Sequence, residues 1–151
     1  MEPSRLVFSS KLPKDQHLAR CRLADLMLDT RIYGGHTTTS DALWAGVPVV
    51  TMQGNHFASR VSSSLLLSMG IPELVTRTVN EYKALALKFA NGRERLDAVR
   101  RKIEANRRTA PLFDTPRFVR NLETAYRMMW ENHRAGREPS AITVVESACQ
   151  R

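Results

Sequence analysis

The sequence predicts an α/β fold with a parallel, Rossmann-like sheet and flanking helices. Two observations predict it: short apolar or β-branched runs alternate with helical patterns over the first two thirds, and only helical patterns follow Val79. The length of 151 residues is that of one domain, and 42% hydrophobic with 25% charged residues is typical of a globular one. We expect about four parallel strands, which is half of a doubly wound sheet.

Four short runs are the candidate strands: residues 6–8, 26–28, 47–51 and 73–75. The run at 47–51 gives the strongest signal, and Gln53-Gly54-Asn55 marks a turn after it. The run at 26–28 is apolar throughout, as in strands that are buried on both faces.

Helical periodicity predicts three helices between and after these runs. The first follows Pro13, the second covers 37–45 with Gly46 at its C-terminal cap, and the third covers 58–69 and stops at Gly70.

Three further helices are expected after Val79, each with one apolar face. Asn91-Gly92 separates the first two, a crossing loop at 111–116 precedes the last, and Gly136 ends it. The faces consist of Tyr82, Leu85, Ala86 and Phe89, then Leu96, Val99 and Ile103, and finally Phe118, Leu122, Ala125, Tyr126, Met129 and Trp130. The last face is so broad that we expect it to pack on a partner surface.

Composition excludes several classes of protein. No apolar run approaches the roughly 18 residues of a membrane span, and the N-terminus lacks the pattern of a secretory signal, so we expect a cytoplasmic protein without membrane contact. Cys21 and Cys149 are too few and too badly placed for a disulfide framework or a zinc site, so we expect free thiols and no metal.

The net charge of +8 raises the possibility of nucleic-acid binding. Residues 77–108 carry a local net charge of +6, but their aromatic side chains, Tyr82 and Phe89, fall on the apolar helix face. Platforms on which bases stack need exposed aromatics beside the cations, so we favour a solvated helix face and keep a basic nucleic-acid-binding protein as a rival.

The junction from Gly34 to Asp41 is the most informative stretch. It follows a candidate strand and opens a helix, where unpaired backbone N–H groups and the helix dipole favour an anion. With the hydroxyls of Thr37 and Thr38 beside them, these groups can cradle a phosphate, and Asp41 can accept hydrogen bonds from a ribose. An ordinary Ser/Thr cap followed by a helix explains the spacing equally well.

Residues 33–51 resemble the signature of the catalytic C-terminal half of the O-linked N-acetylglucosamine transferases. Blocks at 12–30, 58–61, 111–115 and 126–131 resemble neighbouring family segments in the same order, so the resemblance covers about residues 5–136. The family implies the C-terminal half of a glycosyltransferase-B fold, a uridine diphosphate sugar donor, inversion at the anomeric carbon, no metal, and Ser/Thr hydroxyls of proteins as acceptors.

The resemblance also implies site residues. Thr37 and Thr38 would hold the diphosphate and Asp41 the ribose, and His36 would lie beside the sugar-diphosphate. Lys14, His17 and Arg20 match positions that line the uridine pocket, with the main chain of Leu12 at the base. Taken without the resemblance, Lys14, His17 and Arg20 read as exposed surface residues. No catalytic residue and no metal ligand is assigned.

The donor sugar and the completeness of the site stay open. Thr39-Ser40 replaces the usual Gly-Met, and the threonine run is similar to the related SPINDLY-like fucosyltransferases, whereas His36 favours N-acetylglucosamine (GlcNAc). We expect a missing N-terminal half to bind the protein acceptor, so that this chain alone is inactive. A noncatalytic nucleotide- or partner-binding half-domain is a further rival.

The sequence predicts that the chain is divided into three parts. Residues 1–109 are expected to form a partial Rossmann-like domain that binds a nucleotide sugar, and 110–136 its crossing loop and last helix. Residues 137–151 are expected to be a flexible tail. The apolar face of the last helix predicts a homo-oligomer.

Overall fold

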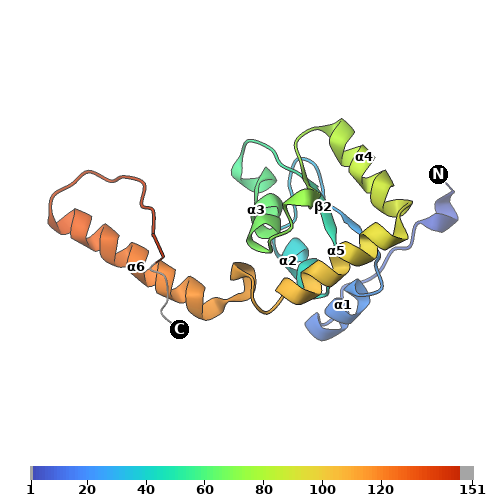
Figure 1. Cartoon of the computed structure of the whole chain (residues 1–151), viewed down its shortest axis with the longest axis horizontal. Coiled ribbons are helices and arrows are strands. Elements are labelled where there is room, and N and C mark those ends of the chain that lie inside the picture. Colours follow the sequence, from blue (N-terminus) through green and yellow to red (C-terminus); the bar gives the residue numbers. More distant parts are fainter. Residues whose placement is uncertain (1, 147–151) are drawn as a thin grey trace.

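The computed structural model describes residues 2–146, so Cys149 lies outside the described residues. Three parallel strands form one sheet in the order β1 (Met27–Leu28), β2 (Val49–Met52) and β3 (Val75–Thr76) (Figure 1). Met27 pairs with Val49 and Thr51 with Val75. The α/β class and the parallel pairing are therefore confirmed.

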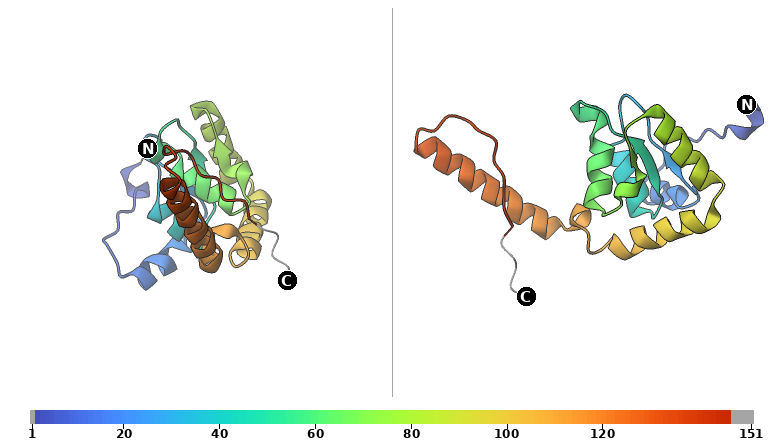
Figure 2. Two further views of the ribbon diagram at one scale, coloured as in Figure 1. Left: turned by 90° about the vertical axis from the view of Figure 1, so that its left-hand side faces the viewer. Right: turned by 45° about the horizontal axis from the view of Figure 1, so that its top comes forward.

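Five helices surround this sheet: α1 (Lys14–Cys21), α2 (Thr37–Trp44), α3 (Val61–Ser68), α4 (Val79–Ala90) and α5 (Arg93–Asn106). In Figure 1 and in the right-hand view of Figure 2, α3 and α4 lie on opposite sides of β2. This covering buries the central strand on both faces, which is why 47–51 reads as a continuous apolar run. The hydrophobic residues with no exposed surface are Leu43, Val49, Val50, Leu66, Met69, Ile71, Leu74 and Ile103.

Two glycines end helices as the sequence predicts. Gly46 has φ 84° and closes α2, and Gly70 has φ 71° and closes α3. A left-handed residue at this position lets the backbone turn back and satisfies the last carbonyl groups of the helix.

A capping box begins α4. The Thr78 hydroxyl accepts a hydrogen bond from the Glu81 N–H at 3.2 Å, and the Glu81 carboxylate accepts bonds from the N–H groups of Arg77 at 2.8 Å and Thr78 at 3.3 Å. The Arg77 bond is the main reason why the pKa of Glu81 is lowered.

The predicted strands 6–8 and 73–75 need correction. Val7 and Phe8 are 90% and 89% exposed and pair with no strand, so residues 2–146 contain three strands rather than four. An apolar run becomes a strand only when a neighbouring strand satisfies its backbone. At 73–75, Pro72 starts a 3-10 turn, η3 (Pro72–Leu74), and the strand begins only at Val75.

The strand at 26–28 is also less buried than predicted. β1 lies at an edge of the sheet among the described residues, and Leu28 is exposed. Its apolar character therefore does not reflect burial on both faces.

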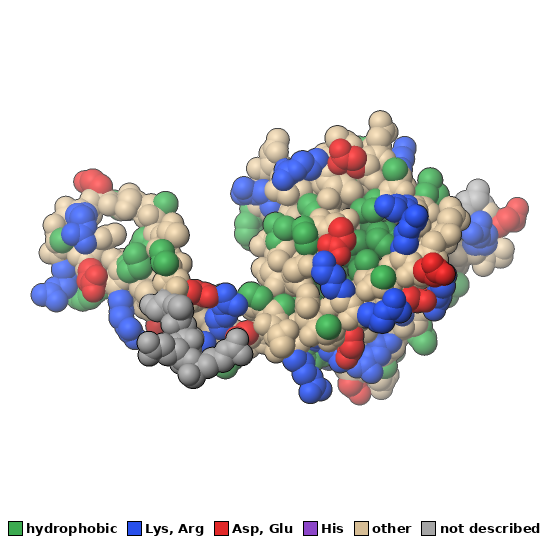
Figure 3. Space-filling model, viewed as in Figure 1, with side chains coloured by type: hydrophobic (Ala, Val, Ile, Leu, Met, Phe, Trp, Pro, Cys, Tyr) green, Lys and Arg blue, Asp and Glu red, His purple; other side chains and the backbone are tan. Residues whose placement is uncertain are grey.

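The last helix, α6 (Thr115–Arg134), projects from the body as a helical arm (Figures 1 and 2). The Asp114 carboxylate caps it by accepting a hydrogen bond from the Arg117 N–H at 3.0 Å, and Gly136 with φ 64° follows its end. None of its residues is buried. Hydrophobic side chains are accordingly visible on the surface of the arm in Figure 3.

Residues 137–146 run back beside the arm without regular secondary structure (Figure 2). The Glu146 carboxylate accepts hydrogen bonds from the Arg117 guanidinium and, at 2.7 Å, from the Asn121 amide. Within residues 2–146, no helix combines the length and the apolar character needed to cross a bilayer.

Candidate functional site

A buried aspartate organises the loop that leads into α2. Asp29 follows β1 and is only 6% exposed. Its Oδ1 accepts hydrogen bonds from the N–H groups of Thr30 at 3.0 Å and Gly35 at 2.7 Å, and its Oδ2 accepts one from the Thr51 hydroxyl at 2.7 Å. One carboxylate thus joins the ends of β1 and β2 to the glycine loop.

The glycine loop is also fixed from α3. The Ser62 hydroxyl donates to the Gly35 carbonyl at 2.7 Å, and the Gly34 N–H donates to the Ala58 carbonyl at 2.9 Å. A Cβ on Gly35 would lie 2.7 Å from the Thr38 hydroxyl oxygen, closer than real Cβ contacts, so a larger residue there would displace the threonine side chains. Glycine therefore lets this loop pack closely against the start of α2.

The three threonines at the start of α2 have different environments. Thr37 and Thr38 are exposed, whereas Thr39 is fully buried and shares a hydrogen bond of 2.9 Å with the Ser62 hydroxyl. Only the first two hydroxyls are available to a ligand. They lie beside the first backbone N–H groups of α2, which have no partner within the helix.

Packing of α1 against α2 brings basic side chains to Asp41, whose side chain is 13% exposed. The Lys14 ammonium contacts Asp41 Oδ1, and His17 Nε2 lies 3.6 Å from Oδ2. The Arg20 guanidinium lies 3.5 Å from His17 Nδ1 and donates to the Ser10 carbonyl at 3.0 Å. Four residues predicted for the site therefore form one cluster, in which Asp41 already has the Lys14 ammonium as an ionic partner and the His17 ring as a neighbour.

Leu12 and the same basic residues line an open concavity of about 470 Å³. Its walls are Ser9, Ser10, Lys11, Leu12, Lys14, His17 and Arg20. Lys14 and His17 of this lining also contact Asp41 of α2, so the concavity adjoins α2 through these contacts. The arrangement can accept an elongated polar ligand with an anionic part.

His36 is held by aromatic contacts. Its ring is stacked on that of Tyr33 at a centroid distance of 5.3 Å, and the Phe57 ring meets it edge-on at 5.6 Å. Its Nε2 is buried and has no hydrogen-bond partner.

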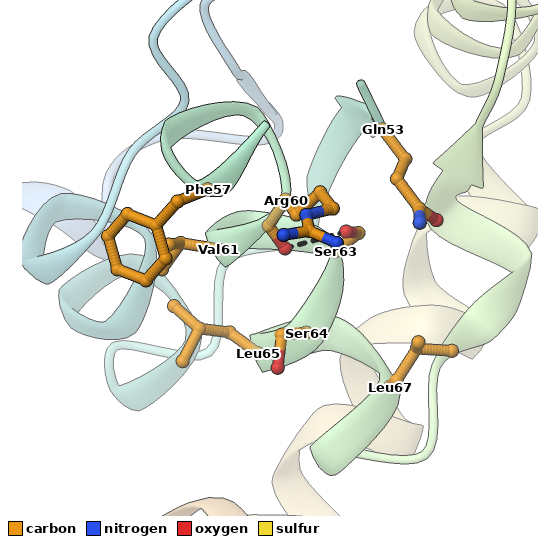
Figure 4. A pocket seen from close by; sticks show the side chains of 8 residues that line it. All are labelled: Gln53, Phe57, Arg60, Val61, Ser63, Ser64, Leu65 and Leu67. Carbon is orange, nitrogen blue, oxygen red and sulfur yellow. Dashed lines mark hydrogen bonds between the residues drawn. The ribbon is translucent and has the colours of Figure 1, made fainter. Parts of the chain in front are cut away.

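A second concavity, of about 500 Å³, lies along α3 (Figure 4). Its lining is mainly apolar and includes Phe57, Val61, Leu65 and Leu67. The only hydrogen bond drawn there joins the Ser63 hydroxyl to the Arg60 carbonyl at 2.7 Å. It therefore lacks the charged cluster that marks the region around Asp41.

The sequence-based site omitted Asp29, Ser62 and Tyr82. The Tyr82 hydroxyl donates to the Asp29 carbonyl at 2.9 Å, and burial raises the pKa of Tyr82. An aspartate directly after a predicted strand and shortly before Gly-Gly was a signal that could have identified Asp29. No local signal marks Ser62, because its role depends on how α3 packs on α2.

Comparisons with known proteins match most of the chain. The family model described as Glycosyl transferase family 41 matches residues 1–122. The chain is 38% identical over 148 residues to the probable UDP-N-acetylglucosamine–peptide N-acetylglucosaminyltransferase SEC of Arabidopsis thaliana, covering 97% of this chain and 15% of the relative. It is 38% identical to the corresponding transferase of Caenorhabditis elegans, covering 95% and 12%.

A solved structure is similar as well. A mutant of the O-GlcNAc transferase of Thermobaculum terrenum matches with a TM-score of 0.81 and 40% identity, over 85% of this chain and 25% of that one. The chain therefore belongs to glycosyl transferase family 41, and its α/β fold is that of part of such an enzyme. It spans about an eighth to a seventh of the length of the curated relatives given above.

Proposed function

We propose that the chain is the donor-binding part of an inverting, metal-independent protein O-glycosyltransferase, which transfers GlcNAc from UDP-GlcNAc to Ser/Thr hydroxyls. One observation carries the proposal: the Asp29-anchored glycine loop presents the start of α2 next to the cluster of Lys14, His17 and Asp41. Membership of family 41 and the names of its relatives support the reaction class. A cytoplasmic location stays a prediction.

Each part of the site has a proposed role. The first N–H groups of α2 and the hydroxyls of Thr37 and Thr38 receive the diphosphate. Asp41 accepts the ribose hydroxyls while Lys14 and His17 hold its carboxylate in place. Arg20 and the main chain of Leu12 belong to the concavity that receives the base.

This arrangement has a chemical consequence for sugar transfer. Negative charge grows on the diphosphate as the bond from the anomeric carbon to the phosphate oxygen breaks. The fixed N–H donors of α2 and the hydroxyls of Thr37 and Thr38 stabilise that charge, as a divalent cation does in other enzymes. In this scheme His36 and Asp41 both contact the donor. The base that deprotonates the acceptor hydroxyl is therefore expected in another part of the enzyme.

Calorimetric titration with UDP tests the diphosphate role. We expect Thr38→Ala to weaken UDP binding by about 1 kcal/mol, about fivefold, because one hydrogen bond to the ligand is lost. Thr109→Ala is the matched control, since Thr109 is exposed in the turn after α5 and its hydroxyl bonds to carbonyl groups at the end of that helix. Equal UDP affinity of the wild type and Thr38→Ala would remove Thr38 from the site, and titration with GDP in parallel checks the choice of base.

A transfer assay tests whether this chain supplies only the donor side of the active site. We expect the chain of 151 residues to transfer no radiolabelled GlcNAc to a protein acceptor, because its relatives are several times longer and it supplies only donor contacts. Addition of the preceding catalytic segment of a family member, fused or in trans, is expected to give transfer. Labelling by the chain alone would show that its residues include a base.

A further inference from the structure

Two buried hydroxyls connect the glycine loop with α2 and α3. Thr39 lies in α2 and Ser62 in α3, and the two residues are 0% and 1% exposed. The Ser62 hydroxyl donates to the Gly35 carbonyl at 2.7 Å, and its oxygen lies 2.9 Å from the Thr39 hydroxyl oxygen. Three segments that are separate in sequence therefore meet at one serine.

The direction of these hydrogen bonds follows from the number of protons available. A hydroxyl has one proton to donate, and a carbonyl oxygen can only accept. The Gly35 carbonyl takes the proton of Ser62, so Thr39 must donate to the Ser62 oxygen. The bonds thus run from Thr39 to Ser62 and on to Gly35, and we call this arrangement the hydroxyl chain.

The hydroxyl chain fixes the plane of the peptide between Gly35 and His36. This peptide is trans, and in a trans peptide the C=O and N–H groups point in opposite directions. Because the Gly35 carbonyl points to the buried Ser62, the His36 N–H points away from α3. Within residues 2–146, no backbone carbonyl accepts a hydrogen bond from this N–H.

A second bond holds the other side of Gly35. Its N–H donates to Oδ1 of the buried Asp29 at 2.7 Å, so buried side chains hold both peptide groups of this glycine. Glycine has the most conformational freedom of any residue. Without the hydroxyl chain, the Gly35–His36 peptide could therefore rotate and turn its N–H away from the start of α2.

The orientation of this N–H matters because of what lies next to it. The first N–H groups of α2 also have no partner within the helix, and the proposed function assigns them to the diphosphate. Successive N–H groups that face the same side can form a cradle for an anion. Donors that are held in place before the ligand arrives stabilise its charge without having to reorient.

We propose that Thr39 and Ser62 are positioning residues for the diphosphate. They do not touch the donor, but they hold the Gly35–His36 peptide so that its N–H joins the donors at the start of α2. This inference rests on the proposed function and adds two residues to it. Thr39 stands where the O-linked GlcNAc transferases usually have glycine, which has no hydroxyl, so the hydroxyl chain is not part of that signature.

NMR titrations that follow the backbone amides test the positioning role, since they also measure weak binding. Ser62→Ala removes the donor to the Gly35 carbonyl and is expected to weaken UDP about threefold to tenfold, the effect of about one hydrogen bond. The affinity for uridine, which lacks the diphosphate, should stay unchanged. The His36 amide signal should shift when UDP binds to the wild type and shift less in Ser62→Ala.

Ser63→Ala is the matched control on the same helix. Ser63 is 2% exposed, and its hydroxyl donates to the Arg60 carbonyl at 2.7 Å instead of to the glycine loop. The control thus removes an equally buried hydroxyl with the same kind of bond. It should leave the affinities for UDP and uridine unchanged, even if it lowers the free energy of unfolding.

Two substitutions of Thr39 keep the test possible if Ser62→Ala does not fold. Thr39→Val keeps the shape of the side chain and removes the hydroxyl. It should weaken UDP but not uridine, and less than Ser62→Ala does, because Ser62 still donates to Gly35. Thr39→Ser, which restores the hydroxyl, should bring the UDP affinity back.

The outcomes separate the positioning role from the proposed function. Wild-type UDP affinity in Ser62→Ala, or in Thr39→Val if the first variant does not fold, would overturn the positioning role and leave the nucleotide site in place. Equal losses of UDP and uridine, or an equal loss of UDP in Ser63→Ala, would also overturn it, because the effect would then be one of stability. If the wild type binds neither compound, the proposed function fails and the positioning role fails with it.

Discussion

The helices of the α/β body (residues 14–110) and the helical arm α6 all have one apolar face in their sequences, but only the body buries that face. Helices α4 and α5 of the body bury Phe89, Leu96 and Ile103 with their apolar faces. The arm has an equally clear apolar face, yet none of its residues is buried. Periodicity thus specifies that a helix forms and which side is apolar, but not whether anything covers that side.

The junction between the two regions explains how the arm keeps a defined start. Phe113, in η4 (Pro111–Phe113), meets the Trp44 ring edge-on at 5.0 Å, and the Arg107 guanidinium lies 5.6 Å from the centre of the same ring. The body therefore holds the connection immediately before α6. Beyond Asp114, described residues of the tail run beside the helix (Figure 2).

Truncation of one leucine in the body and one in the arm is expected to give the largest difference in the loss of unfolding free energy. Leu43 has no exposed surface, so Leu43→Ala should lower the free energy of unfolding by about 3 to 5 kcal/mol through lost burial and a cavity. Leu122 is 37% exposed on the arm, and Leu122→Ala should cost less than about 1 kcal/mol. Urea denaturation followed by circular dichroism measures both.

A pair of smaller truncations makes the same comparison if the Leu43→Ala variant does not fold. Ile103→Val removes one buried methylene and is expected to cost about 1 kcal/mol, still more than Val119→Ala on the arm. Similar losses in the two regions would mean that the arm is packed in solution.

The exposed face of the arm is expected to make the chain self-associate. Tyr126, Met129 and Trp130 contribute a contiguous apolar surface of the kind that soluble proteins usually cover. Sedimentation should show concentration-dependent association, and Met129→Lys should reduce it together with the binding of a hydrophobic dye. Lys83→Met, which adds an apolar residue to the body, serves as a comparison; a strictly monomeric, dye-free wild type would contradict the prediction.

The smallest expected effect concerns the contact between the tail and the arm. Hydrogen bonds from Arg117, and then from Asn121, lower the pKa of Glu146. A lowered carboxyl pKa stabilises the contact above the ordinary glutamate value of about 4.3, and that stabilisation disappears as the pH falls through the lowered pKa. Because these groups are exposed, the contribution is small and salt-sensitive.

An NMR titration of the Glu146 side chain can check this effect. The tail should separate from the arm in acid, and Arg117→Gln should raise the pKa of Glu146, whereas Arg134→Gln at the other end of α6 should leave it unchanged. An unchanged pKa in Arg117→Gln would show that the contact does not form in solution.

Local rules determined much of this protein from sequence alone. Helix ends at Gly46 and Gly70 followed from the conformational freedom of glycine. The apolar run at 47–51 indicated the central strand, which the structure has at Val49–Met52. The motif at 33–51 indicated the family, because its residues and spacing are contiguous in the chain. It also placed the start of α2 correctly, at Thr37.

Only the tertiary structure decided which groups meet across the chain. The three threonines look alike in sequence, but packing of α3 buries Thr39 against Ser62 and leaves Thr37 and Thr38 exposed. Likewise, Asp29 is one more loop aspartate until β2 brings Thr51 to its carboxylate. Strand pairing, burial and side-chain partners join residues far apart in sequence, so they depend on how the elements pack and not on the pattern within any one of them.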